Sequence, residues 1–506
     1  MDDGAAKRKI EKFILPLALI LPLALMTANL TYDEFWSLIH FAPLGAGEIL
    51  TDLSLPNNHP LNTLFLKLLS PVSPAPLLLR LPSLLCGAAV PLLCGELAYR
   101  WSRRCRTTAL VCAALLAMFS APLAVYGGLA RGYAVQLFCL LLCLWGMTLF
   151  AGHPRRAALL MAAGGIGTVL SVPDGALFLL PAGAGFLIYA PSAERRSPVM
   201  WCAGAAIFLF CAAYYGMNFA ALRAGQQWGE DVSGSAGMVK FLLSTGGALV
   251  FPPLLLAVLP VFFSPRKRLW ALGLLLLPLL LALFTKGGPP RCYLYLPAAL
   301  AVLGGMALAE YPASRLPQAA AAAAILGAGA FFTQCGRWRM IDYVAGFEQV
   351  MAEVPPDTLP IFRATAGFPV RCGADADILD ALNERLVSRR FRRIAVFECA
   401  DGEFNGLGQD GGEASFSAGI SGEAAVFGGL PCRIYPLTVG GEPPAGSPGV
   451  AVFSGVRAAE GLAKSPDVMY LNPWLFFHGK MAFFRSAEAA DVPSGVRVYR
   501  VGGSSK

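Results

Sequence analysis

Two adjacent carboxylates, Asp33 and Glu34, follow directly after a long apolar run near the start of the chain. A carboxylate at the edge of an apolar segment is costly to keep charged, so a pair at this point indicates proton transfer or a bound cation. The alternative is that the pair only marks the place where the chain leaves the apolar segment. The first interpretation predicts a general base, or a ligand for a cation, at Asp33 and Glu34.

The segment that begins with these acids ends in Asn57, Asn58, His59 and Pro60. Amide and imidazole groups supply hydrogen-bond donors, and the proline stiffens the turn that carries them. A lone histidine before a proline is usually just a loop residue. Its place on the same segment as the two acids favours a binding role, so Asn58 and His59 are predicted to hold a phosphate or sugar hydroxyls.

Two arginines are each followed two residues later by a tyrosine: Arg131 by Tyr133 and Arg291 by Tyr293. Both arginines fall in short turns between apolar runs, and a guanidinium fork suits phosphate oxygens. Lys286 is a further candidate donor. The alternative for any single arginine is that its side chain only reaches toward lipid headgroups.

No cofactor is predicted. The four histidines stand at positions 40, 59, 153 and 478, and no Cys/His cluster has the spacing of a zinc site. A divalent metal bound by carboxylates stays open. The Gly-rich pieces at 162–167 and 301–310 lie inside apolar runs, so they are interpreted as helix-packing surfaces and not as phosphate loops. Asp174 falls at a predicted outer turn between two spans and could touch substrate, but because it follows a proline it is interpreted as a turn residue.

The candidate residues are separated by apolar runs that predict membrane-spanning helices. Only 14% of the 506 residues are charged and 56% are hydrophobic, whereas soluble domains carry roughly 25% charged residues. About eleven spans near the ~20 residues that a bilayer requires are predicted. They lie at 13–30, 76–99, 107–125, 132–151, 157–173, 175–190, 199–221, 239–263, 269–285, 292–310 and 317–333. The fold class is therefore a polytopic α-helical membrane domain over residues 1–333.

Basic residues cluster in alternate loops, and this asymmetry predicts the orientation. Cytoplasmic loops carry the excess of Lys and Arg, so the N-terminus is predicted to be cytoplasmic in a membrane that the chain crosses several times. The clustered residues are Lys7, Arg8, Lys9, Lys12, Arg100, Arg103, Arg104, Arg106, Arg155, Arg156, Arg195, Arg196, Arg266, Lys267, Arg268 and Arg315. Because the net charge of +8 comes largely from such clusters, nucleic acid is not an expected partner.

Residues 334–506 regain charges and contain no run long enough to span a membrane. A helix is predicted at 375–391 and a strand at 392–398, so this segment is predicted to be a soluble, extracytoplasmic α/β domain. Cysteines 86, 94, 112, 139, 143, 202 and 211 fall inside predicted spans as small apolar residues. Cys335, Cys372, Cys399 and Cys432 could form two disulfides, with the pairing open, or stay free thiols.

Taken in order, several of these motifs resemble the GT-C glycosyltransferases of the dolichyl-phosphate-mannose protein mannosyltransferase class, glycosyltransferase family 39, and the related lipid A aminoarabinose transferase. The resemblance rests on Asp33-Glu34, Asn57–Pro60, the LLLRLPSLLCG stretch, Leu129–Tyr133 and Arg291–Pro297. The chain departs from the family in having a single Pro60 followed by Asn62, where a second proline and a tyrosine are frequent, and Leu129 where a glutamate is frequent. The resemblance therefore does not specify the donor sugar.

The resemblance implies a GT-C fold in an inner, or plasma, membrane, with an active site at the outer surface of that membrane. The donor would be a polyprenyl-phosphate-linked sugar, transferred with inversion to a hydroxyl of an acceptor protein, lipid or glycan. Asp33 would be the base, and Glu34 would orient the acceptor or share that role. Asn58, His59, Arg131, Tyr133, Arg291 and Tyr293 would bind substrate. The alternatives are a transporter or lipid flippase, for which no inverted repeat is detected, and a scaffold for envelope assembly.

Overall fold

The computed structural model describes residues 3–26, 33–34, 37–53, 57–73, 75–102, 105–190, 192–226, 229, 231–249 and 267–309, and, in the C-terminal part, 353, 355, 358–362, 393–397, 423–427, 430–439, 449–453, 468–469, 484–485 and 496–501. The chain divides into two compact units. The first comprises Met1–Met26 and Leu44–Met340, and the second Thr27–Pro43 and Ile341–Lys506. Each unit is described by itself, and a domain boundary after residue 333 stays a prediction.

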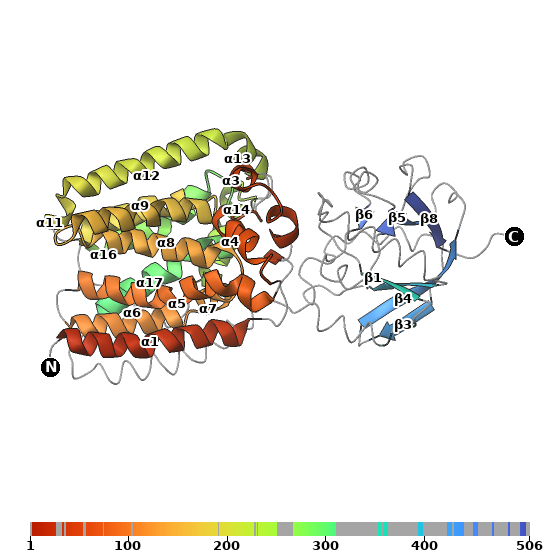
Figure 1. Ribbon diagram of the computed structural model, residues 1–506, viewed down its shortest axis with the longest axis horizontal. Helices are drawn as coiled ribbons and strands as arrows, with labels where there is room; N and C mark the ends of the chain where they lie inside the picture. Colours follow the sequence, from red (N-terminus) through yellow and green to blue (C-terminus); the bar gives the residue numbers. More distant parts are fainter. Residues whose placement is uncertain are drawn as a thin grey trace. The chain divides into compact units, whose positions relative to one another are not determined.

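The first unit is a bundle of helices, several of which run side by side in Figure 1. Its helices are α1 (Asp3–Leu25), α3 (Ala46–Thr51), α4 (Pro60–Leu69), α5 (Pro76–Trp101), α6 (Arg106–Met118), α7 (Ala121–Gly127), α8 (Gly132–Met147), α9 (Pro154–Ser171), α10 (Ala176–Tyr189), α11 (Ser192–Arg195), α12 (Pro198–Met217), α13 (Phe219–Gly225), α14 (Gly234–Leu249), α16 (Lys267–Ala282), the 3-10 helix η3 (Pro290–Tyr293) and α17 (Tyr295–Leu308). Each expected span that the structure describes contains a helix. The last expected span, 317–333, lies outside the described residues.

Prolines begin many of these helices. Pro60, Pro76, Pro154 and Pro198 occupy the first helical position of α4, α5, α9 and α12. A proline there loses no hydrogen bond, because the first N–H groups of a helix have no partner within it, and its fixed φ angle is already helical. The sequence thus fixes where these four helices start.

Apolar side chains on the outside of the bundle fit a membrane protein. Phe13 on α1 is 80% exposed, and Phe208 and Leu209 on α12 are 71% and 65% exposed, which suits contact with lipid better than with water. Among the described residues, α5, α12 and the stretch Pro290–Leu308 are long and apolar enough to cross a membrane. The pair α6 and α7, bent by 69° at its break, would make a fourth span. The other described helices do not meet this criterion of length and composition, so the count of eleven spans stays a prediction.

Small residues set the distances between helices. A Cβ atom built on Gly305 of α17 would lie 2.6 Å from the Cβ of Ala113 on α6, and one built on Gly164 of α9 would lie 2.5 Å from the carbonyl oxygen of Cys139 on α8. Both glycines come from the Gly-rich pieces at 162–167 and 301–310, so their interpretation as packing surfaces is confirmed. The cysteines predicted inside spans lie in α5, α6, α8 and α12 as free thiols.

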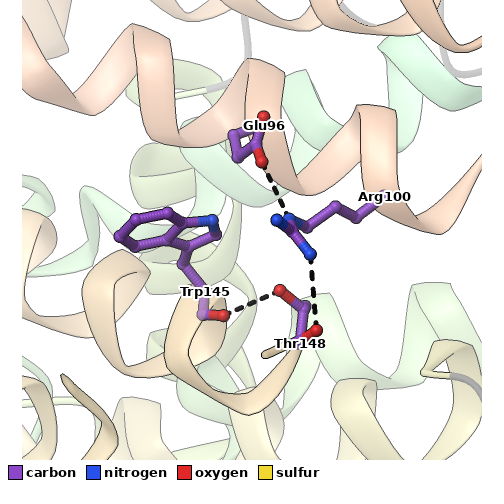
Figure 2. Close-up of polar contacts among 4 residues, drawn as sticks. All are labelled: Glu96, Arg100, Trp145 and Thr148. Carbon is purple, nitrogen blue, oxygen red and sulfur yellow. Dashed lines mark hydrogen bonds and ion pairs between the residues drawn. The ribbon is translucent and has the colours of Figure 1, made fainter. Parts of the chain in front are cut away.

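A polar contact ties the last turn of α5 to the end of α8 (Figure 2). Arg100 Nε donates to Glu96 Oε1 one helical turn earlier, at 2.8 Å, and Arg100 Nη1 donates to the carbonyl oxygen of Thr148 at 3.4 Å. The hydroxyl of Thr148 donates to the carbonyl oxygen of Trp145 at 2.7 Å. Glu96 is only 8% exposed, so its charge is compensated by a neighbour on the same helix face.

Near that end of the bundle lies a small apolar cavity of about 50 Å³. Leu97 of α5, Leu141 of α8, Gly185 of α10, Leu275 of α16 and Ala299 of α17 are among its lining residues. Five helices therefore meet around a space that no side chain fills.

The second unit contains a sheet of eight strands among the described residues. The strands are β1 (Thr358–Phe362), β2 (Arg393–Phe397), β3 (Glu423–Phe427), β4 (Leu430–Val439), β5 (Gly449–Phe453), β6 (Val468–Met469), β7 (Phe484–Arg485) and β8 (Val496–Val501). Their order is β1-β2-β4-β8-β5-β7-β6, with β3 also paired to β4. Only the pair β1 and β2 is parallel among these pairings.

The pairing of β1 with β2 bears on the predicted α/β character of the tail. The strand predicted at 392–398 is confirmed as β2. A parallel pair needs a long crossover connection, and the helix predicted at 375–391 falls in that connection, outside the described residues. Cys335, Cys372 and Cys399 also lie outside them, while Cys432 lies in β4, so a disulfide in the tail stays a prediction.

Candidate functional site

The start of α8 brings His59 and Arg131 together. The backbone N–H of Gly132 donates to His59 Nδ1 at 2.8 Å, and His59 Nε2 lies 3.3 Å from Arg131 Nη2. Because Nδ1 accepts a hydrogen bond, a neutral imidazole must carry its proton on Nε2. The bonding pattern therefore places two N–H donors side by side, where one ligand oxygen can accept from both. Arg131 Nη2 also donates to Asn57 Oδ1 at 3.0 Å.

Two neighbouring helices hold the backbone of this turn. The amide of Asn62 on α4 donates to the carbonyl oxygen of Ala130 at 2.8 Å, and the hydroxyl of Ser83 on α5 lies 3.2 Å from the carbonyl oxygen of Arg131. Gly132 has no room for a side chain, since a Cβ there would meet the carbonyl oxygen of Ser171 and the ring of His59. Contacts from α4, α5 and α9 therefore fix the backbone that carries Arg131.

Tyr133 connects the two arginines predicted to act together. Its hydroxyl accepts a hydrogen bond from Arg291 Nε at 3.2 Å, and the guanidinium of Arg131 lies 5.8 Å from its ring centroid. The ring also packs edge-to-face on His59 at 4.7 Å and on Tyr126 at 5.2 Å. With Arg131 only 2% exposed, these contacts hold two cationic side chains around one buried phenol.

Asn58 and Tyr293, also predicted to bind substrate, are placed differently. The amide of Asn58 donates to the carbonyl oxygens of Ile49 and Asp52, both at 2.8 Å, and its Oδ1 accepts from Thr63 at 3.1 Å. It therefore fixes the loop, and its neighbour Asn57 is the one that meets Arg131. The spacing of the two asparagines in the sequence could not distinguish them.

Tyr293 packs in an aromatic cluster. Its ring centroid lies 6.2 Å from that of Phe178 and 6.0 Å from that of Phe241. Its hydroxyl accepts from the N–H of Gly288 at 3.3 Å. These contacts position η3, which carries Arg291, and they assign Tyr293 a supporting place in the fold.

Sequence reasoning did not predict that Asp174 pairs with a second polar side chain, Gln136, in the same unit. Gln136 Nε2 donates to Asp174 Oδ1 at 2.9 Å. Cys292, next to Arg291, contacts Asp174 on one side and Tyr133 on the other. Burial raises the pKa of Asp174 to about 6. The sequence offered one signal for this pair, the carboxylate of Asp174 in a predicted outer turn. It offered none for Gln136, because the burial of that side chain depends on how α8 packs.

Asp33 and Glu34 belong to the second unit and are described apart from the residues above. Glu34 is 1% exposed, and the hydroxyl of Ser37 donates to the carbonyl oxygen of Asp33 at 3.0 Å, just before the π-helix η1 (Ser37–Phe41). Their catalytic roles stay predictions. Within the described part of the chain, no group of three His, Cys, Asp or Glu side chains is placed to hold a metal ion.

No protein-family model and no curated protein sequence matches the chain. The crystal structure of ArnT from Cupriavidus metallidurans in the apo state is similar at 14% identity and a TM-score of 0.50, over 83% of this chain and 97% of that one.

Two further solved structures are also similar. ArnT bound to undecaprenyl phosphate has a TM-score of 0.49 at 14% identity, over 83% and 97% of the two chains. The arabinofuranosyltransferase AftD from Mycobacteria has a TM-score of 0.45 at 14% identity, over 98% of this chain and 40% of that one. The similarity to apo ArnT shows that the chain has a fold of the GT-C class, so the resemblance seen in the sequence is confirmed at the level of the fold.

Proposed function

We propose that the protein is a membrane glycosyltransferase that moves a sugar from a polyprenyl-phosphate donor to an acceptor hydroxyl, with inversion, on the extracytoplasmic face. The observation that carries the proposal is the pair of donors formed by His59 Nε2 and Arg131 Nη2, with Arg291 held nearby through Tyr133. Shared fold supports it as well, since ArnT is a protein whose structure has been solved with undecaprenyl phosphate.

The donor pair suits the leaving group of this reaction. A lipid phosphate leaves as a stable anion, so it needs stabilisation of charge more than it needs a proton. An oxygen beside His59 and Arg131 can accept from both, and the guanidinium of Arg291 adds a second positive charge. Because these groups are already held by Gly132, Asn57 and Tyr133, little reorganisation would be needed as the bond to the sugar breaks.

The acceptor side of the reaction needs a base. Asp33 takes the proton of the acceptor hydroxyl as that oxygen attacks the anomeric carbon, and Glu34 orients the acceptor or shares this role. Inversion requires the attacking oxygen and the leaving phosphate to lie on opposite faces of the sugar ring. The base and the phosphate-binding arginines are accordingly separate groups in the sequence.

The test is transfer by the purified protein in detergent. We expect labelled sugar to pass from a polyprenyl-phosphate sugar to an added acceptor lipid, peptide or glycan, with the anomeric configuration inverted. A transporter or flippase would give no transfer, because a detergent solution has no two sides. If the wild-type protein transferred no sugar from any polyprenyl-phosphate donor to any acceptor offered, the proposal would be wrong.

A further inference from the structure

The carboxylate of Asp174 is aimed at α8 although it stands just before another helix. An Asp at such a position commonly caps the helix that follows, but the N-cap of α10 is Gly175, which makes no side-chain capping bond. Asp174 Oδ1 instead accepts from the amide of Gln136 at 2.9 Å. Gln136 is 5% exposed, so a polar side chain is buried in α8 opposite this carboxylate.

The turn that carries Asp174 is fixed from the other side by α12. The hydroxyl of Tyr215 donates to the carbonyl oxygen of Pro173 at 2.7 Å, and it accepts from the N–H of Ala176 at 3.3 Å. Gly175 approaches α9 so closely that a Cβ there would meet the carbonyl group of Thr168. The carboxylate is therefore held by a rigid turn.

The pair is adjacent to the phosphate-binding residues. Tyr133 and Gln136 are three residues apart on α8, so they share one face of the helix and are separated by less than one turn of about 5.4 Å. Cys292 contacts both Asp174 and Tyr133, and Tyr133 accepts from Arg291. Through Cys292 and Tyr133, the pair is therefore connected to Arg291, one of the residues proposed to bind the donor phosphate.

We propose that Asp174 and Gln136 bind the hydroxyl groups of the donor sugar, an inference that rests on the proposed function. A carboxylate accepts strong hydrogen bonds from hydroxyls, and two of its lone pairs match hydroxyls on adjacent ring carbons. The carboxamide of Gln136 can both donate and accept. The expected substrate class is a neutral sugar with adjacent free hydroxyls, since an acidic sugar would meet the repulsion of a like charge.

A competing explanation is that Gln136 and Asp174 only tie α8 to the turn before α10. The two explanations differ in whether the negative charge of the Asp174 carboxylate is needed for binding. Asp174→Asn keeps an oxygen that accepts from Gln136, so a simple tie survives, while the strong acceptor for sugar hydroxyls is lost. A tie would also influence both lipids alike, whether or not they carry a sugar.

The experiment compares two lipids on the purified full-length protein. Binding of undecaprenyl phosphate and of undecaprenyl-phosphate glucose is measured for the wild type and for Asp174→Asn, with Asp231→Asn as the matched control, because Asp231 is an exposed carboxylate of the same unit. We expect Asp174→Asn to bind undecaprenyl phosphate as the wild type does and to bind the sugar-bearing lipid roughly tenfold to a hundredfold more weakly. Asp231→Asn should change neither affinity.

Several results would overturn the inference. Equal weakening for both lipids would assign Asp174 to the structure alone, and unchanged affinity for both would remove it from the site. If Asp174→Asn failed to fold, Gln136→Met would replace it and should show the same selective loss of the sugar-bearing lipid. If the wild type bound neither lipid, the proposed function itself would be contradicted. If the wild type bound both lipids but Asp174→Asn showed no selective loss of the sugar-bearing lipid, only this inference would fail.

Discussion

Arg131 donates to Asn57 while its guanidinium lies beside His59. Because one side chain makes both contacts, a substitution at Arg131 tests whether this geometry binds the phosphate. Arg131→Lys keeps the charge, but a single ammonium cannot keep the bond to Asn57 and grip a phosphate with the same geometry. We expect affinity for undecaprenyl phosphate to fall about tenfold, and Arg291→Lys to weaken it less. Equilibrium binding to the purified protein measures this, with the exposed Arg223 of α13, changed to Lys, as control. Unchanged affinity in both Arg131→Ala and Arg291→Ala would exclude the two arginines.

Asp33 is expected to matter for turnover and not for donor binding. Asp33→Asn keeps the shape of the side chain and removes the base, so the rate of transfer should fall by roughly 100-fold or more while the affinity for donor stays nearly the same. Glu34→Gln should have a smaller effect if Glu34 only orients the acceptor. Both rates are measured with purified protein and labelled donor. Full transfer by Asp33→Asn would refute its role as base.

The titration of Asp174 predicts a pH dependence of sugar recognition. Burial raises the pKa of Asp174 to about 6, so its carboxylate is charged at pH 7.5 and becomes protonated as the pH falls through 6. Gln136, Cys292 and Tyr215 face this group, and all of them are uncharged across this range. The affinity for undecaprenyl-phosphate glucose, a phosphodiester that does not itself titrate in this range, should therefore fall below pH 6 in the wild type. In Asp174→Asn that affinity should be weak at every pH; a wild-type-like pH profile in that variant would point to another group.

Helices within the bundle depend on glycines where two elements cross. Gly305→Val would force a branched side chain against Ala109 and Ala113 of α6, so we expect a loss of about 1–3 kcal/mol in stability. Gly183→Val in α10 is the matched control, because nothing lies within 4 Å of a Cβ there. Thermal melting in detergent compares them. Equal melting temperatures for the two variants would mean that the crossing of α6 and α17 adapts without cost.

Much of the element level could be predicted from the sequence, and the reasons are physical. Apolar runs predict helices because a bilayer leaves no other way to satisfy the backbone, and prolines such as Pro76 and Pro154 mark their first turns. The meeting of His59 with Gly132 could not be predicted in this way, since it depends on how α4 packs against α8. Two further features also depend on how the helices pack and could not be predicted from the sequence. They are the contact of Arg131 with Asn57 and not Asn58, and the burial of Gln136 opposite Asp174.

At the scale of the whole molecule, orientation in the membrane is the main prediction still to be tested. The distribution of basic residues predicts that the chain after Phe332 lies outside and that the loop at 266–268 lies inside. Reporter fusions after residue 340 and within that loop can measure both. An active cytoplasmic reporter after residue 340 would reverse the assignment and would move the proposed site to the other side of the membrane.

The two compact units divide the chain differently from the predicted domains, whose boundary after residue 333 stays a prediction. The sequence places residues 1–333 in one membrane domain, whereas the structure groups Thr27–Pro43, with Asp33 and Glu34, with the C-terminal unit. Hydropathy reports whether a segment prefers lipid or water; it does not report which distant segment a polar loop joins. The grouping of this loop with the tail therefore had no local signal.

The unfilled space around Gly185 is a site where a larger side chain could stabilise the protein. Gly185 lines the cavity between α10 and its neighbours, and a Cβ there would meet only Leu274 Cδ1, at 3.9 Å. Alanine at this position would fill part of the void and would also favour the helix, by about 1 kcal/mol in model helices. Gly185→Ala should raise the melting temperature in detergent and leave transfer unchanged, because none of the proposed substrate-binding side chains is among those that line the cavity. The added stability would make this variant a convenient parent for purification and crystal growth.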